Sequence, residues 1–111
     1  MGLACCNNGM IYGLSGAYKN TLFKVAPVET LIIGRDPAFS NIVIGPESRR
    51  VSRRHCSVKY DSRNKIYEII NYSNNYVIIN NSTCLPKNQR VNVHKGSVIE
   101  IGDSCNSFNL L

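Results

Sequence analysis

The sequence contains no tryptophan, and its 111 residues include few of the amino acids that favour helices. Leucine and alanine together number 11, whereas isoleucine and valine number 21. Because β-branched side chains fit pleated strands better than helices, long helices, coiled coils and helical bundles are excluded as the main architecture. No apolar run approaches the roughly 20 residues that a membrane-spanning helix needs, so no membrane association is expected.

Paired cysteine ligands are also missing. The five cysteines show no Cys-x-x-Cys spacing, and the two histidines, His55 and His94, lie far apart in the sequence. A zinc site normally combines two close pairs of ligands, so neither a metal nor another cofactor is expected. An odd number of cysteines without a secretory signal segment predicts free thiols in a cytoplasmic protein, with Cys56 buried as a small apolar residue.

The chain is long enough for one domain, predicted over residues 10–111 after a flexible leader of residues 1–9. Gly2, Cys5 and Cys6 are residue types that accept lipid chains. However, the myristoylation pattern has Ser or Thr where this chain has Cys6, so we expect a leader without a lipid anchor.

What the sequence does contain is an alternation of short apolar segments and turn residues. Glycine, proline, asparagine and serine make up 37 residues, spread along the chain. These residue types separate strands by turns, so the sequence predicts an all-β fold, a β-sandwich of about eleven short strands. The clearest feature is a hairpin over residues 55–70, in which the five polar residues 61–65 join two apolar strands.

The positive charge is concentrated in one part of the chain. Residues 35–65 carry a net charge of +5 out of a total of +6. Four arginines lie within residues 49–54, in a segment predicted to be a loop. Arginine binds phosphate oxygens through a planar, two-pronged donor group, which points to nucleic acid or a phosphorylated protein as the ligand. The loop contains no aromatic residue to stack on bases, which favours the phosphorylated protein.

No arrangement of residues predicts catalysis. The carboxylates are scattered along the chain, and there is no glycine-rich nucleotide loop. Ser52 and His55 have the residue types of a nucleophile and a base, but at the start of a strand this spacing points them to opposite faces. The sequence therefore predicts a protein that is not an enzyme.

An ordered set of short motifs is more specific than any of these features alone. Residues 34–35 (Gly-Arg) end one apolar segment, 52–55 (Ser-Arg-Arg-His) open the next long strand, 71–75 (Asn-Tyr-Ser-Asn-Asn) close the hairpin, and 95–103 follow. In order and spacing this set resembles the forkhead-associated (FHA) domain family, whose members bind phosphothreonine peptides. The resemblance covers residues 10–111.

The resemblance implies an eleven-stranded β-sandwich whose loops at one end bind phosphothreonine. Arg35 corresponds to the family's phosphate-binding arginine, and Ser52 to the serine whose hydroxyl donates to the phosphate. Arg53 stands where the family often has an Asn or Arg that also reaches the phosphate. Asn74 stands at a position, often Ser or Thr, that helps to line the phosphate pocket.

Other residues would orient the peptide and hold the loops. By the same resemblance, Asn75 matches the asparagine that hydrogen-bonds the peptide main chain beside the phosphoresidue. Gly34 and His55 match positions that brace the site, and His55 would hold two loops in register rather than contact the ligand. The family usually has Asn-Gly-Thr where this chain has Asn75-Tyr76-Val77. Because tyrosine resists the positive φ that glycine permits, we expect a reshaped turn at Tyr76.

Together these features predict a non-catalytic signalling module that binds a phosphothreonine-containing protein, such as a Ser/Thr kinase or its substrate. One alternative is a scaffold of the same fold that docks proteins independently of phosphorylation. Another, with less support, is a basic nucleic-acid-binding domain, although no nucleic-acid partner is expected. Nucleic-acid binding would show a steep salt dependence, whereas one phosphate site would show a shallow one.

Overall fold

The computed structural model describes residues 8–103 and 105–111, which form eleven strands and one 3₁₀ turn, Gly16–Tyr18. The predicted number of strands is confirmed. The strands are β1 (Gly9–Gly13), β2 (Leu22–Val25), β3 (Thr30–Gly34), β4 (Ile42–Val43), β5 (Cys56–Asp61), β6 (Ile66–Asn71), β7 (Val77–Ile79), β8 (Thr83–Leu85), β9 (Arg90–His94), β10 (Val98–Ile101) and β11 (Ser107–Leu110).

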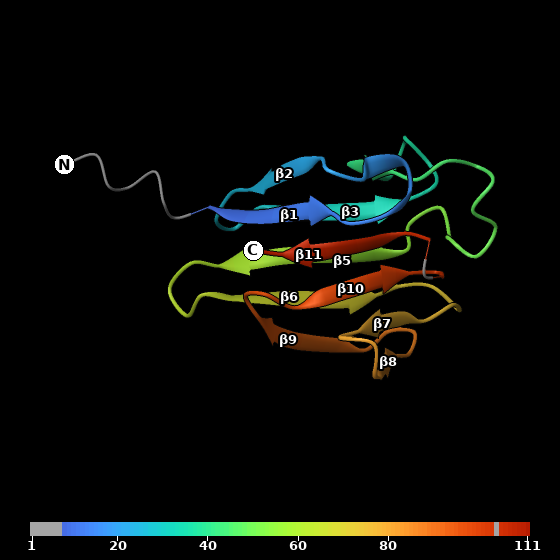
Figure 1. Ribbon diagram of the computed structural model, residues 1–111. Helices are drawn as coiled ribbons and strands as arrows, with labels where there is room; N and C mark the ends of the chain where they lie inside the picture. The colour runs from blue at the N-terminus through green and yellow to red at the C-terminus, as the bar shows by residue number, and fades with distance from the viewer. Residues whose placement is uncertain (1–7, 104) are drawn as a thin grey trace.

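The strands form two sheets that pack face to face, so the predicted all-β sandwich is confirmed (Figure 1). One sheet has the order β2-β1-β11-β10-β7-β8 and the other β4-β3-β5-β6-β9. The pairing of β3 with β4 is parallel, whereas the other strand pairs are antiparallel. The predicted hairpin is also present as β5 and β6, joined by residues 62–65.

Alternation of side chains between the two faces of each strand explains the core. In β6, Tyr67, Ile69 and Asn71 are buried between the sheets, and the residues between them are partly exposed. Isoleucine and valine supply most of the buried side chains. The Tyr67 hydroxyl accepts a hydrogen bond of 2.8 Å from the Met10 backbone N–H, which joins the two sheets. The hydroxyl of Tyr67, the largest fully buried side chain, therefore has a hydrogen-bond partner inside the core.

The N-terminal predictions are only partly within reach of the structure. Gly2, Cys5 and Cys6 lie outside the described residues, and the division into a leader of residues 1–9 and a domain of residues 10–111 stays a prediction. Among the residues that are described, no helix is long and apolar enough to span a membrane. Cys56 is buried, and burial raises the pKa of its thiol to about 12.

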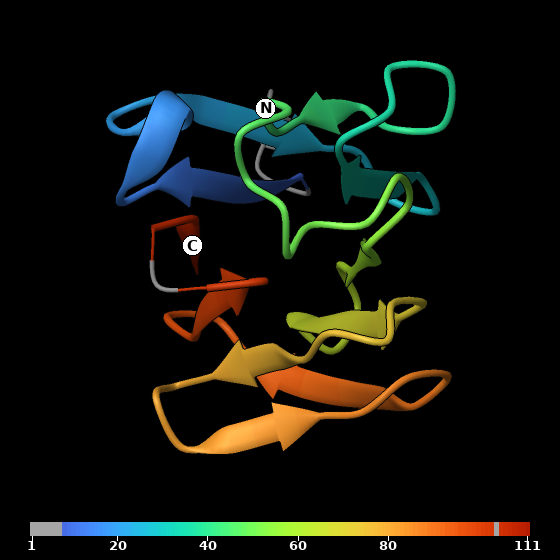
Figure 2. The same cartoon turned by 90° about the vertical axis from the view of Figure 1, so that its right-hand side faces the viewer.

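Three loops that are separate in sequence meet at one end of the sandwich. They are residues 35–41, 44–55 and 72–76, at the right-hand side of Figure 1 and facing the viewer in Figure 2. Gly102, which follows β10, lies at the same end, since a Cβ atom there would be 2.9 Å from the Arg50 carbonyl oxygen. This end of the molecule therefore brings together the motifs of residues 34–35, 52–55 and 71–75, which are joined by hydrogen bonds.

Candidate functional site

The close approach of two loops begins at Gly34, the last residue of β3. A Cβ atom at this position would lie 2.1 Å from the Arg53 carbonyl oxygen, so a side chain has no room there. The backbone N–H groups of Arg35 and Asp36 donate to the carbonyls of Ser52 and Arg53, at 3.0 and 3.2 Å. Gly34 thus lets residues 35–36 run directly against the segment that carries Ser52.

The Arg35 side chain is held in place by the same segment. Its Nε donates to the carbonyl oxygen of Val51, and the residue is partly buried. Within residues 8–103 and 105–111 the one ion pair joins Arg90 to Glu68 at 3.3 Å, so no carboxylate forms an ion pair with Arg35. A shallow hollow of about 250 Å³ opens beside it, lined by Arg35, Asp36, Pro37 and Arg53. Because two arginines face one aspartate, the hollow carries an excess of positive charge.

Ser52 meets a second serine that the sequence analysis did not identify. The hydroxyl oxygens of Ser52 and Ser73 are 2.6 Å apart, and Ser73 is buried. Ser73 Oγ also accepts a hydrogen bond of 3.0 Å from the Asn75 N–H. When Ser73 donates to Ser52, the hydroxyl hydrogen of Ser52 stays available for a ligand. Asn74 is exposed, and the described residues offer its side chain no hydrogen bond, so Ser73 rather than Asn74 contacts Ser52.

His55 lies beneath these loops and is fully buried. The ring Nδ1 accepts a hydrogen bond of 3.1 Å from the Ser52 backbone N–H. The backbone N–H of His55 donates to the Ile33 carbonyl at 2.9 Å, and its backbone carbonyl accepts the Tyr72 N–H at 2.8 Å. One residue therefore joins β3, the Ser52 segment and the 72–76 loop. Burial lowers the pKa of His55, although backbone groups of Tyr76 and Asn75 oppose the shift. The neutral ring is the form that can accept the Ser52 N–H.

Asn71 fixes the conformation of the third loop from within the core. Its Nδ2 donates to the carbonyls of Asn75 and Leu85 at 3.0 and 2.8 Å, and its Oδ1 accepts the Ser73 N–H at 2.9 Å. The Asn75 side chain in turn donates to the Arg50 carbonyl at 2.9 Å. This contact ties the 72–76 loop to the 44–55 loop.

The backbone at Tyr76 agrees with the expectation of a reshaped turn. Among the residues that the structure describes, six non-glycine residues have a positive φ, and Tyr76 is not one of them. The turn therefore does not use, at Tyr76, the backbone conformation that glycine permits and tyrosine resists.

The exposed rim of this end is strongly basic. Arg49, Arg50, Arg53 and Arg54 are all exposed, and none pairs with a carboxylate in the described part of the chain. The Arg54 guanidinium lies 4.3 Å from the centre of the Tyr72 ring, a distance typical of a cation–π contact. The site thus combines several free positive charges with the hydroxyls of two serines.

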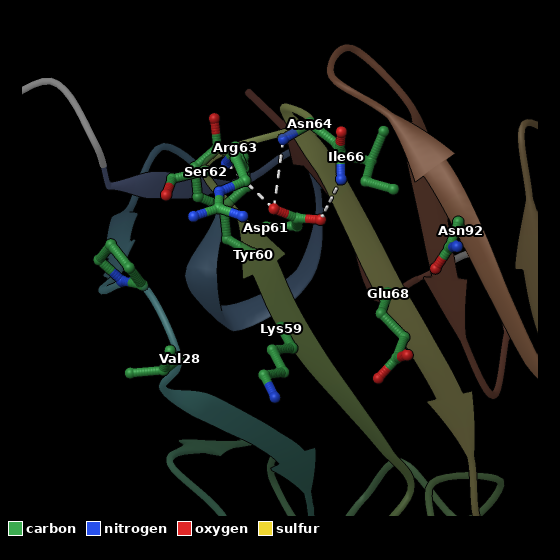
Figure 3. Close-up of a pocket in the computed structure, with 11 residues that line it drawn as sticks. Val28, Lys59, Tyr60, Asp61, Ser62, Arg63, Asn64, Ile66, Glu68 and Asn92 are labelled. Carbon is green, nitrogen blue, oxygen red and sulfur yellow. Dashed lines mark hydrogen bonds between the residues drawn. The ribbon is translucent and has the colours of Figure 1, made fainter.

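A larger hollow, of about 570 Å³, lies at the opposite end of the sandwich (Figure 3). Lys59 and Glu68 occupy facing positions on β5 and β6, and Asp61 accepts hydrogen bonds from the hairpin residues Arg63 and Asn64. Two basic and two acidic residues line this hollow, so it lacks the excess of positive charge found beside Arg35 and does not resemble an anion site. No cluster of side chains suited to hold a metal ion occurs in the described residues.

One family model matches the chain. It describes the FHA domain and covers residues 31–102, more than half of the chain and all three loops of the site. Among curated proteins, no sequence matches the chain.

Several solved structures with the same fold are FHA domains. The FHA domain of the CT664 protein from Chlamydia trachomatis has a TM-score of 0.77 and 21% identity, with 94% of this chain and 96% of that chain covered. The FHA domain of an Arabidopsis thaliana hypothetical protein has a TM-score of 0.78 and 23% identity, covering 93% and 83%. The MEK1 FHA domain bound to a HOP1 phosphothreonine peptide has a TM-score of 0.74 and 13% identity, covering 93% and 94%.

Proposed function

We propose, because this chain belongs to the FHA domain family, that it binds phosphothreonine in partner proteins through the loops at one end of its sandwich. The observation that carries the proposal is the state of Arg35. Its backbone and Nε are fixed by Ser52 and Val51, yet its charge has no carboxylate partner among the described residues. A positioned, unpaired guanidinium next to a serine hydroxyl matches the needs of a phosphate dianion.

The proposed contacts are sufficient in strength. Arg35 and Arg53 would contact the phosphate oxygens from one side and Ser52 from the other, while Asn74 would line the pocket. Hydrogen bonds to charged groups contribute about 1.5–3 kcal/mol each, so three supply roughly 5–9 kcal/mol, the range of submillimolar to micromolar binding. Asn75 would contact the peptide main chain, with its side-chain oxygen free to accept while Nδ2 is held by the Arg50 carbonyl.

The same geometry supports a binding role rather than a catalytic one. The hydroxyl oxygen of Ser52 lies 2.6 Å from that of Ser73, and Nδ1 of His55 accepts the Ser52 backbone N–H. Ser52 and His55 therefore do not form the hydroxyl-to-imidazole contact of a nucleophile and its base. His55 and Gly34 would act by bracing the loops.

The comparisons support a protein partner that carries phosphothreonine. One structural neighbour is bound to a phosphothreonine peptide, and another, the FhaA FHA domain, is bound to the intracellular domain of Rv3910. For this chain we propose a partner modified by a Ser/Thr kinase, or the kinase itself.

A fluorescence anisotropy titration with three matched peptide libraries tests the function. We expect binding to phosphothreonine peptides and none to the phosphoserine or unphosphorylated forms. Arg35→Ala and Ser52→Ala should each weaken binding at least tenfold, because each removes a contact to the phosphate. Arg63→Ala, which removes an exposed arginine from the opposite end, is the matched control and should bind normally.

Other outcomes would favour the alternatives. Equal binding to all three libraries would indicate a scaffold that does not depend on phosphorylation. Binding to single-stranded DNA that falls steeply with salt would indicate nucleic-acid recognition.

A further inference from the structure

One large aromatic side chain, Tyr76, stands exposed at the rim of the phosphate site. Tyr76 is 53% exposed and lies directly after Asn75, which bonds to the Arg50 carbonyl across the site. Nothing in the phosphate contacts described above uses its ring. An exposed aromatic at the rim of a binding site is a typical anchor for a partner side chain.

The backbone on both sides of Tyr76 is firmly held. The N–H of Asn75 donates to Ser73 Oγ at 3.0 Å, and its carbonyl accepts Asn71 Nδ2, also at 3.0 Å. On the other side, Val77 is buried and pairs with Ile101 of β10. Because the backbone is already ordered, a contact to the ring costs little conformational entropy on binding.

The ring lies within reach of a ligand that occupies the phosphate site. Ser73 Oγ is 2.6 Å from Ser52 Oγ, and Tyr76 is three residues further along the chain. Consecutive Cα atoms are 3.8 Å apart, so the Cα of Tyr76 lies at most about 11 Å from that of Ser73. An extended peptide advances about 3.3 Å per residue. The backbone of Tyr76 is therefore within about three ligand residues of the contact between Ser73 and Ser52.

We infer that Tyr76 selects an apolar or aromatic ligand side chain within three residues of the phosphothreonine, an inference that rests on the proposed phosphothreonine binding. The phosphate charge is met by Arg35 and Ser52, so the ring is free to pack against carbon atoms. Apolar side chains pack against an aromatic face, and a second ring adds a stacked or edge-on contact. The competing source of specificity is Arg50, which would favour an acidic side chain instead.

Phosphothreonine peptides with systematically varied flanks separate these possibilities. The reference peptide has alanine at the three positions on each side of the phosphothreonine. Each position is then replaced in turn by leucine, phenylalanine or aspartate, and dissociation constants are measured by fluorescence anisotropy. For the wild-type chain we expect leucine or phenylalanine at one position to strengthen binding about three- to tenfold over alanine, the range of one aromatic contact.

Variants at Tyr76 locate the source of that preference. Tyr76→Ala should abolish the gain while leaving affinity for the alanine-flanked peptide within twofold, and Tyr76→Phe should retain the gain. Leu22→Ala removes a side chain of the same 53% exposure from β2 and should change nothing. Since both side chains are exposed, the three variants should unfold at the wild-type temperature.

The contrary results are distinct from one another. If the alanine-flanked phosphothreonine peptide binds but no apolar residue improves binding, or the gain survives Tyr76→Ala, the role of Tyr76 is refuted and the phosphate site stands. The same holds if aspartate is preferred and Arg50→Ala removes that preference. If the alanine-flanked peptide binds no better than its unphosphorylated form, the proposed function itself is refuted, and the inference with it.

Discussion

A single methyl group at Gly34 is expected to separate the two loops that carry Arg35 and Ser52. In Gly34→Ala the new Cβ would lie 2.1 Å from the Arg53 carbonyl oxygen and 2.7 Å from Ser40 Oγ. Real Cβ atoms essentially never approach other heavy atoms closer than 3.0 Å, and the nearer of these atoms belongs to the backbone. The loop must therefore move away by roughly 1 Å, since a backbone carbonyl cannot rotate aside as a side chain can.

The size of the effect follows from the contacts that this movement disturbs. Residues 35–36 donate backbone hydrogen bonds to the carbonyls of Ser52 and Arg53, and Ser40 Oγ donates to the Arg53 carbonyl at 2.8 Å. Each such bond contributes about 0.5–1.5 kcal/mol, and overpacking costs about 1–3 kcal/mol. Because the loop relaxes and keeps part of these bonds, we expect Gly34→Ala to lower the free energy of unfolding by about 2–4 kcal/mol.

Urea denaturation followed by circular dichroism measures this change, because the chain has no tryptophan for fluorescence. Gly45→Ala is the control. Its new Cβ would lie 2.2 Å from a carboxylate oxygen of Glu47, the end of a flexible side chain that can turn away, so we expect a loss below about 1 kcal/mol. A Gly34→Ala protein as stable as Gly45→Ala would refute the reasoning. In buffer without urea, where Gly34→Ala is folded, the variant should also bind phosphothreonine peptide at least tenfold more weakly than wild type, because Arg35 is displaced from Ser52.

Three further perturbations follow from other parts of the structure. Val28 is 85% exposed and has a φ of 62°, so Val28→Gly should relieve strain and raise the free energy of unfolding by about 0.5–1 kcal/mol in the same urea titration. In Asn71→Asp, a carboxylate cannot donate to the Asn75 and Leu85 carbonyls, so the titration should show a loss of about 2–4 kcal/mol. Burial lowers the pKa of His55, so below pH 6.5 the unfolded chain binds a proton that the folded chain does not. Titrations at several pH values should therefore show stability falling as the pH drops below 6.5, by up to about 1.4 kcal/mol per pH unit from this residue.

Each of these expectations has its own comparison. A Val28→Gly protein less stable than wild type would show that the turn is not strained. Asn71→Asp should recover part of its loss at low pH, where a protonated carboxyl can donate once; no recovery would contradict the assignment of Asn71 as a donor. His55→Phe should flatten the pH dependence, whereas His94→Ala, an exposed histidine, should leave the His55 contribution in place.

The sandwich was predictable because its signals are local. Alternating isoleucine and valine with turn residues between them determine where strands begin and end, and the β5–β6 hairpin followed directly from residues 61–65. The concentration of arginine in residues 49–54 likewise indicated which loop carries exposed positive charge. No local signal in the sequence showed how Arg35 contacts that loop. Their contact depends on the absence of a Cβ at Gly34, which has meaning only once β3 and β5 are paired.

The contact between Ser73 and Ser52 could not be predicted from sequence spacing. Ser73 and Asn74 are neighbours, and sequence order alone does not tell which side chain turns towards Ser52. Asn71 determines which of the two side chains faces Ser52. Its buried amide bonds to the Ser73 N–H and the Asn75 carbonyl and so fixes the path of the loop. At Tyr76, by contrast, the residue type alone indicated that the turn would avoid a positive φ there, and the structure agrees.

The site separates the groups that build it from the groups that carry charge. Neutral residues make the frame: Gly34 permits the close approach, Ser73 and Asn71 hold the third loop, and His55 is held neutral by burial. The arginines join this frame through backbone atoms and the Nε of Arg35, which leaves their charge unpaired among the described residues. Replacing a charged residue and replacing a frame residue should therefore affect binding and stability differently. Arg53→Ala should weaken phosphopeptide binding while leaving stability within about 0.5 kcal/mol, because an exposed side chain is lost. A substitution of a frame residue should weaken phosphopeptide binding and also lower the stability of the fold. If Arg53→Ala unfolds as easily as such a frame variant, the charged residues and the frame residues do not have separate roles.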